Sequence, residues 1–447
     1  MLARIESVMD SVHGSSHHRR KNLCECVAYG FEALANSAFR GGVMVYAGTI
    51  GEFNAIRPLL DLIGENVPNI GFIVIVGQEQ YAQSIHRSIP NAAVVVPTGP
   101  DPRVVDRLFE LASPRLLVFS EGPCLHAHFP IRCDLSLSAA CLRHGVPAIV
   151  ANASLYDRAF QSRIDIVEHV LFRNLHTNAI RHWYAPNSGI RDELFSAGVP
   201  AKRISVVGDM KFDNIKFSEL APPSAELAEI LSHLTQSNTP IVVAGSVNAI
   251  DEQAAVIAGW LELRRLYPKA RLVIAPRYVN NVDVMKTLYE YLIKHNIRFA
   301  RRSAGSAAVS EADVIVVDVF GELLYYYAHA SVTYLGRNHG VLEPLRFGKP
   351  IIVAPITDWD KDHVSFFNYN LMCQAKGLLQ LDDKRNIGKA FARFLEDADF
   401  RSCYTVTATE IVKTQQGAAQ RIFNDLQQKQ ILGPVRRSGS AMKCGPA

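Results

Sequence analysis

Glu52 is the first residue in the chain whose type and position suit acid–base chemistry. It follows the turn Gly48-Thr49-Ile50-Gly51, which in turn follows an apolar run typical of a buried strand. Open α/β sheets present ligand-binding groups at such strand ends. A carboxylate there can take the proton of a hydroxyl as its oxygen attacks a sugar carbon, which is general-base catalysis. The helix dipole alone would also explain a Glu in the first turn of a helix.

Three turns in the second half of the chain carry groups suited to phosphate or ribose. Ala244-Gly245-Ser246 offers backbone amides and the Ser246 hydroxyl just before a predicted helix. Arg277 follows Ala275-Pro276, and its guanidinium can pair with two phosphate oxygens. Gly321 would let a nucleotide base approach the backbone closely. Each turn alone is explained by a structural role, but several at successive strand ends indicate a nucleotide site.

The stretch Tyr334–Pro344 is the most informative part of the sequence. Its pattern predicts a strand, a Gly-containing turn, a short helix opening near Gly340 and then another buried strand, so that a phosphate can lie at the helix N-terminus. Glu343, one turn into that helix, could accept hydrogen bonds from ribose hydroxyls. This arrangement is typical of the C-terminal half of a nucleotide-sugar glycosyltransferase.

The elements that must position these turns are strands alternating with helices. The predicted fold class is α/β, with two Rossmann-like domains whose parallel sheets face a central cleft. The strands are expected at 43–47, 70–76, 93–96, 116–119 and 148–151 in the first series, and at 241–244, 271–275, 314–317, 332–335 and 351–354 in the second.

The predicted division gives a polar N-terminal segment (1–40) and an acceptor-binding domain (41–218), then a nucleotide-sugar-binding domain with C-terminal helices (219–430). The linker is expected at Leu220-Ala221-Pro222-Pro223-Ser224, between the two α/β series. The tail, 431–447, has no apolar period and is expected to be disordered.

Composition narrows the function classes. The 447 residues suffice for two domains, and a net charge of +4 does not indicate a nucleic-acid partner. Eight cysteines without metal-ligand spacing indicate reduced thiols, and His126, His128, His144 and His169 fit no usual metal site. No apolar run is long enough to span a membrane, so we expect a cytoplasmic protein with at most peripheral contact with the inner membrane.

The chain resembles the 3-deoxy-D-manno-octulosonic acid (Kdo) transferases, which move Kdo from CMP-Kdo to the lipid A precursor in lipopolysaccharide biosynthesis. The resemblance extends from about residue 43 to 380. It rests on Gly51-Glu52, Gly208-Asp209-Met210-Lys211-Phe212-Asp213, Ala244-Gly245-Ser246, Pro276-Arg277, Gly321-Glu322-Leu323 and Leu342-Glu343-Pro344. It implies the GT-B architecture and direct displacement with inversion, and no cofactor or metal is predicted.

The resemblance also implies roles for single residues. Glu52 would be the general base, Ser246 and Arg277 would bind the CMP phosphate, and Glu343 would bind the ribose. The turn at Gly321 and Glu322 would face the cytosine, and Lys211 would face the donor.

Several segments depart from the family pattern. Ser246-Val247-Asn248 and Pro276-Arg277-Tyr278 lack the two histidines usual at these places, and Gly336–Gly340 is a shortened loop. In that loop Arg337, Asn338, His339 and Gly340 are candidate donor contacts, with Arg337 and His339 as replacements for lost phosphate contacts. On the acceptor side, Glu121 and Asn152 stand in altered segments. Residues 1–40 have no counterpart of the family's hydrophobic anchor, so the acceptor could be soluble.

Two other functions fit the sequence. One is a UDP-sugar-dependent glycosyltransferase or epimerase of the same fold, because ribose contacts like that of Glu343 are common there. The other is a catalytically silent nucleotide-binding relative, suggested by the missing histidines. Binding of CMP against UDP separates these functions.

Overall fold

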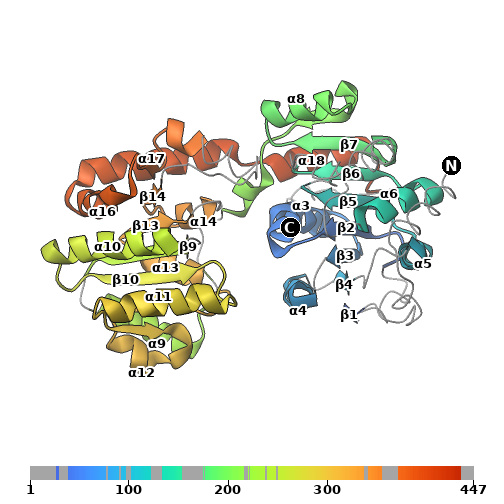
Figure 1. Cartoon of the computed structure of the whole chain (residues 1–447). Helices are drawn as coiled ribbons and strands as arrows, with labels where there is room; N and C mark the ends of the chain where they lie inside the picture. Colours follow the sequence, from blue (N-terminus) through green and yellow to red (C-terminus); the bar gives the residue numbers. More distant parts are fainter. Residues whose placement is uncertain are drawn as a thin grey trace, which may run out of the picture. The chain divides into compact units, whose positions relative to one another are not determined.

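The computed structural model consists of two α/β units (Figure 1). Unit 1 comprises the chain up to Asn214 together with the residues from Gln416 on, and unit 2 comprises Ile215–Gln415. The structure describes residues 27–433 except for 30–38, 77–78, 90–91, 97–101, 122–132, 154–174, 176, 216–219, 221, 237–238, 248–249, 337–340 and 355–370. The predicted disorder of the tail therefore concerns residues almost entirely outside the described ranges.

Unit 1 contains an eight-stranded sheet in the order β1-β4-β3-β2-β5-β6-β7-β8, in which only the β1–β4 pair is antiparallel. Its strands are β1 Val27–Tyr29, β2 Val43–Ala47, β3 Phe72–Val76, β4 Ala92–Val96, β5 Leu116–Ser120, β6 Ala148–Ala151, β7 Ile180–Ala185 and β8 Ile204–Val206. Its helices are α3 Ile50–Asn66, α4 Glu79–Ser88, α5 Pro102–Ala112, α6 Cys133–His144, α8 Ser188–Ser196 and α18 Ala418–Gln428, with 3-10 turns η2 Ala201–Arg203 and η3 Met210–Asn214.

Unit 2 contains a seven-stranded parallel sheet in the order β11-β12-β10-β9-β13-β14-β15. Its strands are β9 Ile241–Val247, β10 Arg271–Pro276, β11 Phe299–Arg301, β12 Val314–Val316, β13 Val332–Leu335, β14 Ile351–Val353 and β15 Leu379–Gln380. Its helices are α9 Ala225–Thr235, α10 Ile250–Leu266, α11 Val282–Lys294, α12 Ser306–Ser310, α13 Leu323–His329, α14 Leu342–Leu345, α16 Ile387–Glu396 and α17 Ala398–Gln415, with 3-10 turns η4 Arg302–Ala304 and η5 Lys384–Asn386.

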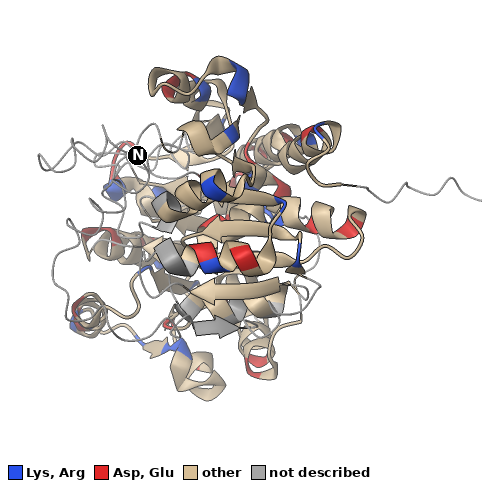
Figure 2. Cartoon of the chain, turned by 90° about the vertical axis from the view of Figure 1, so that its right-hand side faces the viewer, with Lys and Arg blue, Asp and Glu red and all other residues tan. Residues whose placement is uncertain are grey.

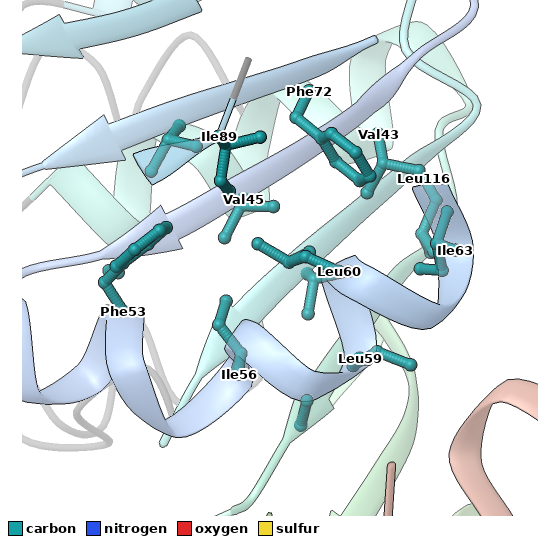
Figure 3. Close-up of a cluster of buried hydrophobic side chains, with 14 of the residues drawn as sticks. Val43, Val45, Phe53, Ile56, Leu59, Leu60, Ile63, Phe72, Ile89 and Leu116 are labelled. Carbon is teal, nitrogen blue, oxygen red and sulfur yellow. The ribbon is translucent and has the colours of Figure 1, made fainter. Parts of the chain in front are cut away.

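The core of unit 1 forms where α3 packs on the sheet. Figure 3 shows Phe53, Ile56 and Leu60 of α3 directed toward strand side chains such as Val43 and Val45. Their spacing of three and four residues places them on one face of the helix. Fully burying each large apolar side chain contributes about 1.5 to 3 kcal/mol. This packing fixes the start of α3, and therefore Glu52, against the sheet.

Most strands could be predicted from the sequence because they are buried on both faces of the sheet. In β2, β3, β4, β5 and β6 every residue is buried, as expected for parallel strands covered on both sides. In Figure 2 the Lys, Arg, Asp and Glu residues lie mainly on helices, and the strands in view are mostly tan. The charged residues are thus kept to the outer layers.

Two expectations about the ends of the chain differ from the structure. The segment before residue 40, expected to be polar and partly helical, contributes strand β1, which pairs antiparallel with β4 through Val27–Tyr29. The C-terminal helices were assigned to the second domain, but α18 belongs to unit 1. The reason is its apolar face, since Ala419, Ile422 and Phe423 join the core cluster of unit 1.

Candidate functional site

Glu52 is held in place by the start of α3. Thr49 is the N-cap, and its hydroxyl accepts a hydrogen bond from the Glu52 backbone N–H at 3.2 Å. The Glu52 carboxylate reaches back to accept from the Gly48 N–H at 2.7 Å. A Thr followed three residues later by Glu is the capping-box pattern. The helix cap thus explains part of the presence of Glu52, and it fixes where the carboxylate lies.

The pKa of Glu52 is shifted in a way that its role in the helix cap does not explain. Burial raises the pKa of Glu52 to about 7, and the negative charge of Glu121 adds to the rise. The Gly48 N–H, the Thr49 hydroxyl and the Lys211 ammonium favour the ionised form without offsetting the effect. A general base works best when its pKa lies near the operating pH. Glu52 therefore has the protonation behaviour of a base at neutral pH.

Glu121 and Lys211 form an ion pair next to Glu52. The Lys211 Nζ lies 2.5 Å from the Glu121 Oε1, and only 8% of the Glu121 side chain is exposed. Glu121 follows β5, which is the neighbour of β2, the strand before Glu52. Because the chain leaves β2 toward β3 and returns on the other side at β5, this is the point where the strand order reverses. Ligands bind α/β sheets at that point.

Asn152 supports the same cluster from the end of β6. Its side-chain oxygen accepts a hydrogen bond from the Met210 N–H at 3.1 Å, one residue before Lys211. Asn152 and Glu121 both have left-handed backbone, with φ of 57° and 60°. Non-glycine residues in this conformation are uncommon and gather at functional sites. Unit 1 thus brings together Glu52, Glu121, Lys211 and Asn152. That Lys211 faces the donor stays a prediction.

Unit 2 lines up the predicted donor residues along one edge of its sheet. The neighbouring strands β12, β10, β9 and β13 are parallel, so their carboxyl ends meet at the same edge. Gly321 follows β12, Arg277 follows β10, Ser246 lies near the end of β9, and Glu343 follows β13 in α14. The strand order reverses between β9 and β13, where a nucleotide is expected.

At the end of β9, neighbouring segments pack tightly against the backbone of Gly245 and Ser246. Ser246 has left-handed backbone with φ of 55°. A methyl group on Gly336 would lie 2.1 Å from the Ser246 carbonyl oxygen, and one on Gly245 would lie 1.7 Å from the Tyr327 hydroxyl. Only glycine fits at these two positions. The Ser246 turn is consequently held in one conformation by its neighbours.

Tyr327 is a residue of this edge that the sequence did not reveal. It is buried in α13, and burial, together with the charge of Glu343, raises the pKa of its hydroxyl. Part of the Glu343 side chain is exposed, while burial raises the pKa of its carboxyl above the ordinary value. The run of three tyrosines, Tyr325 to Tyr327, is the signal that could have indicated it.

The remaining donor candidates divide into three cases. Arg277 is exposed, and its guanidinium stacks on Tyr278 with 5.6 Å to the ring centre. The Glu322 carboxylate is paired with Arg302, which the sequence did not indicate, at 2.7 and 2.9 Å. Arg337, Asn338, His339 and Gly340 lie outside the described residues.

Groups of acidic, histidine or cysteine side chains that could hold a metal ion do not occur within the described ranges. The helices described also include none long and apolar enough to cross a membrane.

Two α/β units of this topology define the GT-B class, to which nucleotide-sugar glycosyltransferases and epimerases belong. A crystal structure of UDP-N-acetylglucosamine 2-epimerase aligns with a TM-score of 0.61 at 14% identity, covering 90% of this chain and 99% of that one. HepE from Anabaena, in complex with UDP and glucose, aligns with a TM-score of 0.57 at 11% identity, covering 87% and 100%. At these identities the likeness shows the fold alone.

In sequence, the chain is similar to one family of glycosyltransferases. A family model described as 3-Deoxy-D-manno-octulosonic-acid transferase (kdotransferase) matches residues 17–214. The 3-deoxy-D-manno-octulosonic acid transferase of Haemophilus influenzae is 22% identical over 421 residues, 91% of this chain and 90% of that protein. That of Chlamydophila psittaci is 25% identical over 376 residues, 80% and 78% of the two chains. Over most of its length the chain is therefore similar, at low identity, to Kdo transferases.

Proposed function

We propose that the protein transfers Kdo from CMP-Kdo to an acceptor hydroxyl, with inversion at the anomeric carbon. Glu52 acts as the general base, and the carboxyl edge of the unit 2 sheet binds the CMP portion of the donor. The observation that carries this proposal is the Glu52 carboxyl, fixed by the α3 cap and titrating at about pH 7.

The chemical step is a single displacement. The acceptor oxygen forms a bond to the anomeric carbon of Kdo as the bond from that carbon to the CMP phosphate oxygen breaks. The electron pair of the broken bond leaves with CMP, and the proton of the acceptor hydroxyl passes to Glu52. Because the Glu52 carboxyl loses its proton as the pH rises through about 7, an increasing fraction of the enzyme can accept a proton above that pH.

The donor side needs positive or N–H groups that stabilise the charge developing on CMP. Arg277 contributes a positive charge at the unit 2 edge, and Ser246 supplies a hydroxyl and backbone amides on the neighbouring strand. In this proposal Glu343 accepts hydrogen bonds from the ribose. Gly321, with φ of 87° and open space where a Cβ would lie, allows the cytosine to approach the turn.

The acceptor is either the lipid A precursor, as the family resemblance suggests, or a soluble sugar. Glu121 and Asn152 lie on the acceptor side of this proposal because they are clustered around Glu52 in unit 1. The altered segments in which they stand favour an acceptor that differs from that of other family members.

Calorimetric titration with CMP and, separately, UDP tests the donor assignment. Selective binding of CMP supports the proposal, whereas preference for UDP moves the protein to the UDP-sugar enzymes. Binding of neither nucleotide indicates a relative that has lost its donor site.

Substitution of Glu52 by Gln tests the base assignment. The variant keeps a side-chain oxygen for the Gly48 N–H but cannot take a proton. We expect turnover of CMP-Kdo to fall by about 100- to 10,000-fold with CMP affinity unchanged. A variant that retains full turnover would refute the role of Glu52.

A further inference from the structure

The turn that follows β12, residues Asp318 to Glu322, is held at both ends by three consecutive residues. At its start, the Asp318 carboxylate accepts from the Ser303 N–H at 2.8 Å and from the Ser303 hydroxyl at 2.6 Å. The Arg301 Nε lies 3.0 Å from the same carboxylate. Two backbone segments that are distant in sequence are thereby tied together.

At the other end of the turn, Arg302 forms a two-pronged pair with Glu322. Its Nε and one terminal nitrogen lie 2.7 and 2.9 Å from the two carboxylate oxygens. The Arg302 side chain is only 6% exposed, and it also contacts Glu226 of α9 at 3.2 Å. A buried guanidinium that loses its partners is strongly unfavourable, so this pair resists opening. Planar two-pronged geometry also fixes direction, which a lysine cannot reproduce.

The middle of this braced turn faces solvent. Phe320 is 75% exposed, and Gly321 has φ of 87° with no atom near the place of a side chain. The turn lies at the carboxyl end of β12, beside β10, and Arg277 directly follows β10. Both ends of the turn are thus fixed by charged side chains while its centre is left open. A loop that only connects β12 to α13 has no need of such fixation.

We propose that Arg302 and Ser303 are positioning residues for the donor nucleotide, because they hold the Asp318–Glu322 turn in the conformation that contacts it. This inference rests on the proposed function, and it deepens that function by assigning donor affinity to residues that do not touch the donor. Misplacing a binding group by about 1 Å can cost up to about 100-fold.

The main test variant is Arg302→Lys, which keeps the positive charge but cannot form the two parallel hydrogen bonds of the guanidinium to Glu322. We expect its Kd for CMP, measured by calorimetry, to rise about 10- to 100-fold. The KM for CMP-Kdo should rise in parallel, with kcat at saturating donor nearly unchanged. Hydrogen exchange in residues 318–323 should become faster. Ser303→Ala is a milder change at the other end of the turn, and it should also raise the Kd for CMP.

The matched control is Arg298→Lys. Arg298 also makes a two-pronged pair, with Asp313 at 3.1 Å for both contacts, but it lies before β11 and away from the turn. This control should bind CMP as the native protein does.

The outcomes separate the inference from the proposed function. If the native protein binds CMP and both Arg302→Lys and Ser303→Ala bind it equally well, the inference fails alone. Equal losses in the Arg302 and Arg298 variants would also overturn it, since they would reflect general destabilisation. If the native protein prefers UDP and Arg302→Lys weakens UDP, the donor assignment fails and the positioning role stands. A native protein that binds neither nucleotide overturns both.

Discussion

At the scale of single residues, Glu52 and Glu121 form a pair of carboxyls whose charges influence each other. Because the negative charge of Glu121 raises the pKa of Glu52, Glu121→Gln should lower it. The acid limb of the pH–rate profile, expected near pH 7 in the native enzyme, should therefore move to lower pH. Initial rates measured from about pH 5 to 9 test this. Glu110→Gln, a surface change in the same unit, should leave the profile in place, and an unmoved limb in Glu121→Gln would contradict the coupling.

The raised pKa of the Glu52 carboxyl also makes the folded protein less stable at alkaline pH. The folded state keeps the Glu52 proton up to about pH 7, whereas a free Glu loses it near 4.5. Between these values the folded state binds more protons, so stability falls as pH rises through the window. The total is on the order of 3 kcal/mol. Glu52→Gln should therefore melt higher than the native protein at pH 8 and show little gain at pH 4, and a lower melting temperature at pH 8 would contradict this.

At the scale of elements, the segment after β8 holds the last helix of unit 1. Asp213 in η3 accepts hydrogen bonds from the Gly417 and Ala419 N–H groups at the start of α18, which has no cap from its own N-cap residue. Replacing Asp213 with Ala should destabilise unit 1 by about 1 to 2 kcal/mol, as for other lost caps. Hydrogen exchange should quicken in α18. Ser224→Ala, which removes the cap of α9, should quicken exchange in unit 2 instead, and the reverse pattern would refute the assignment.

How far the sequence predicts an element depends on where it lies in the sheet. The central strands β2, β6, β9 and β13 begin at the expected residues because burial on both faces produces uninterrupted apolar runs. Strand β7 was missed, since it contains the exposed Arg181 and half-buried His182. The short β8 and β11 lie at or near sheet edges and carry few buried residues.

The candidate site, too, could be predicted from the sequence only in part. Local motifs placed Glu52, Ser246, Arg277 and Glu343 at strand ends, because each follows an apolar run. The ion pair of Lys211 with Glu121 joins residues 90 positions apart in sequence, and local patterns carry no information about such contacts. The same holds for Arg302 and Glu322, and for the left-handed backbone at Ser246.

At the scale of the whole molecule, unit 1 is built from both ends of the chain. Ile422, Phe423 and Leu426 of α18 lie in its core, and together their burial is worth about 5 to 9 kcal/mol. That is comparable with the entire stability of a typical domain. A chain ending at Gln415 should therefore lose cooperative unfolding of unit 1, while unit 2, with its own core, keeps it. Calorimetry and limited proteolysis check this, and a fully protease-resistant unit 1 without α18 would contradict it.

Because α18 belongs to unit 1 but follows unit 2 in the sequence, unit 1 cannot complete its core until most of the chain has been synthesised. A ribosome adds about 5 to 20 residues each second, and about 200 residues separate the last strand of unit 1 from α18. For roughly 10 to 40 seconds the nascent first unit must therefore wait with part of its apolar core uncovered. During that interval chaperones have a natural substrate, and the second unit can mature before the first.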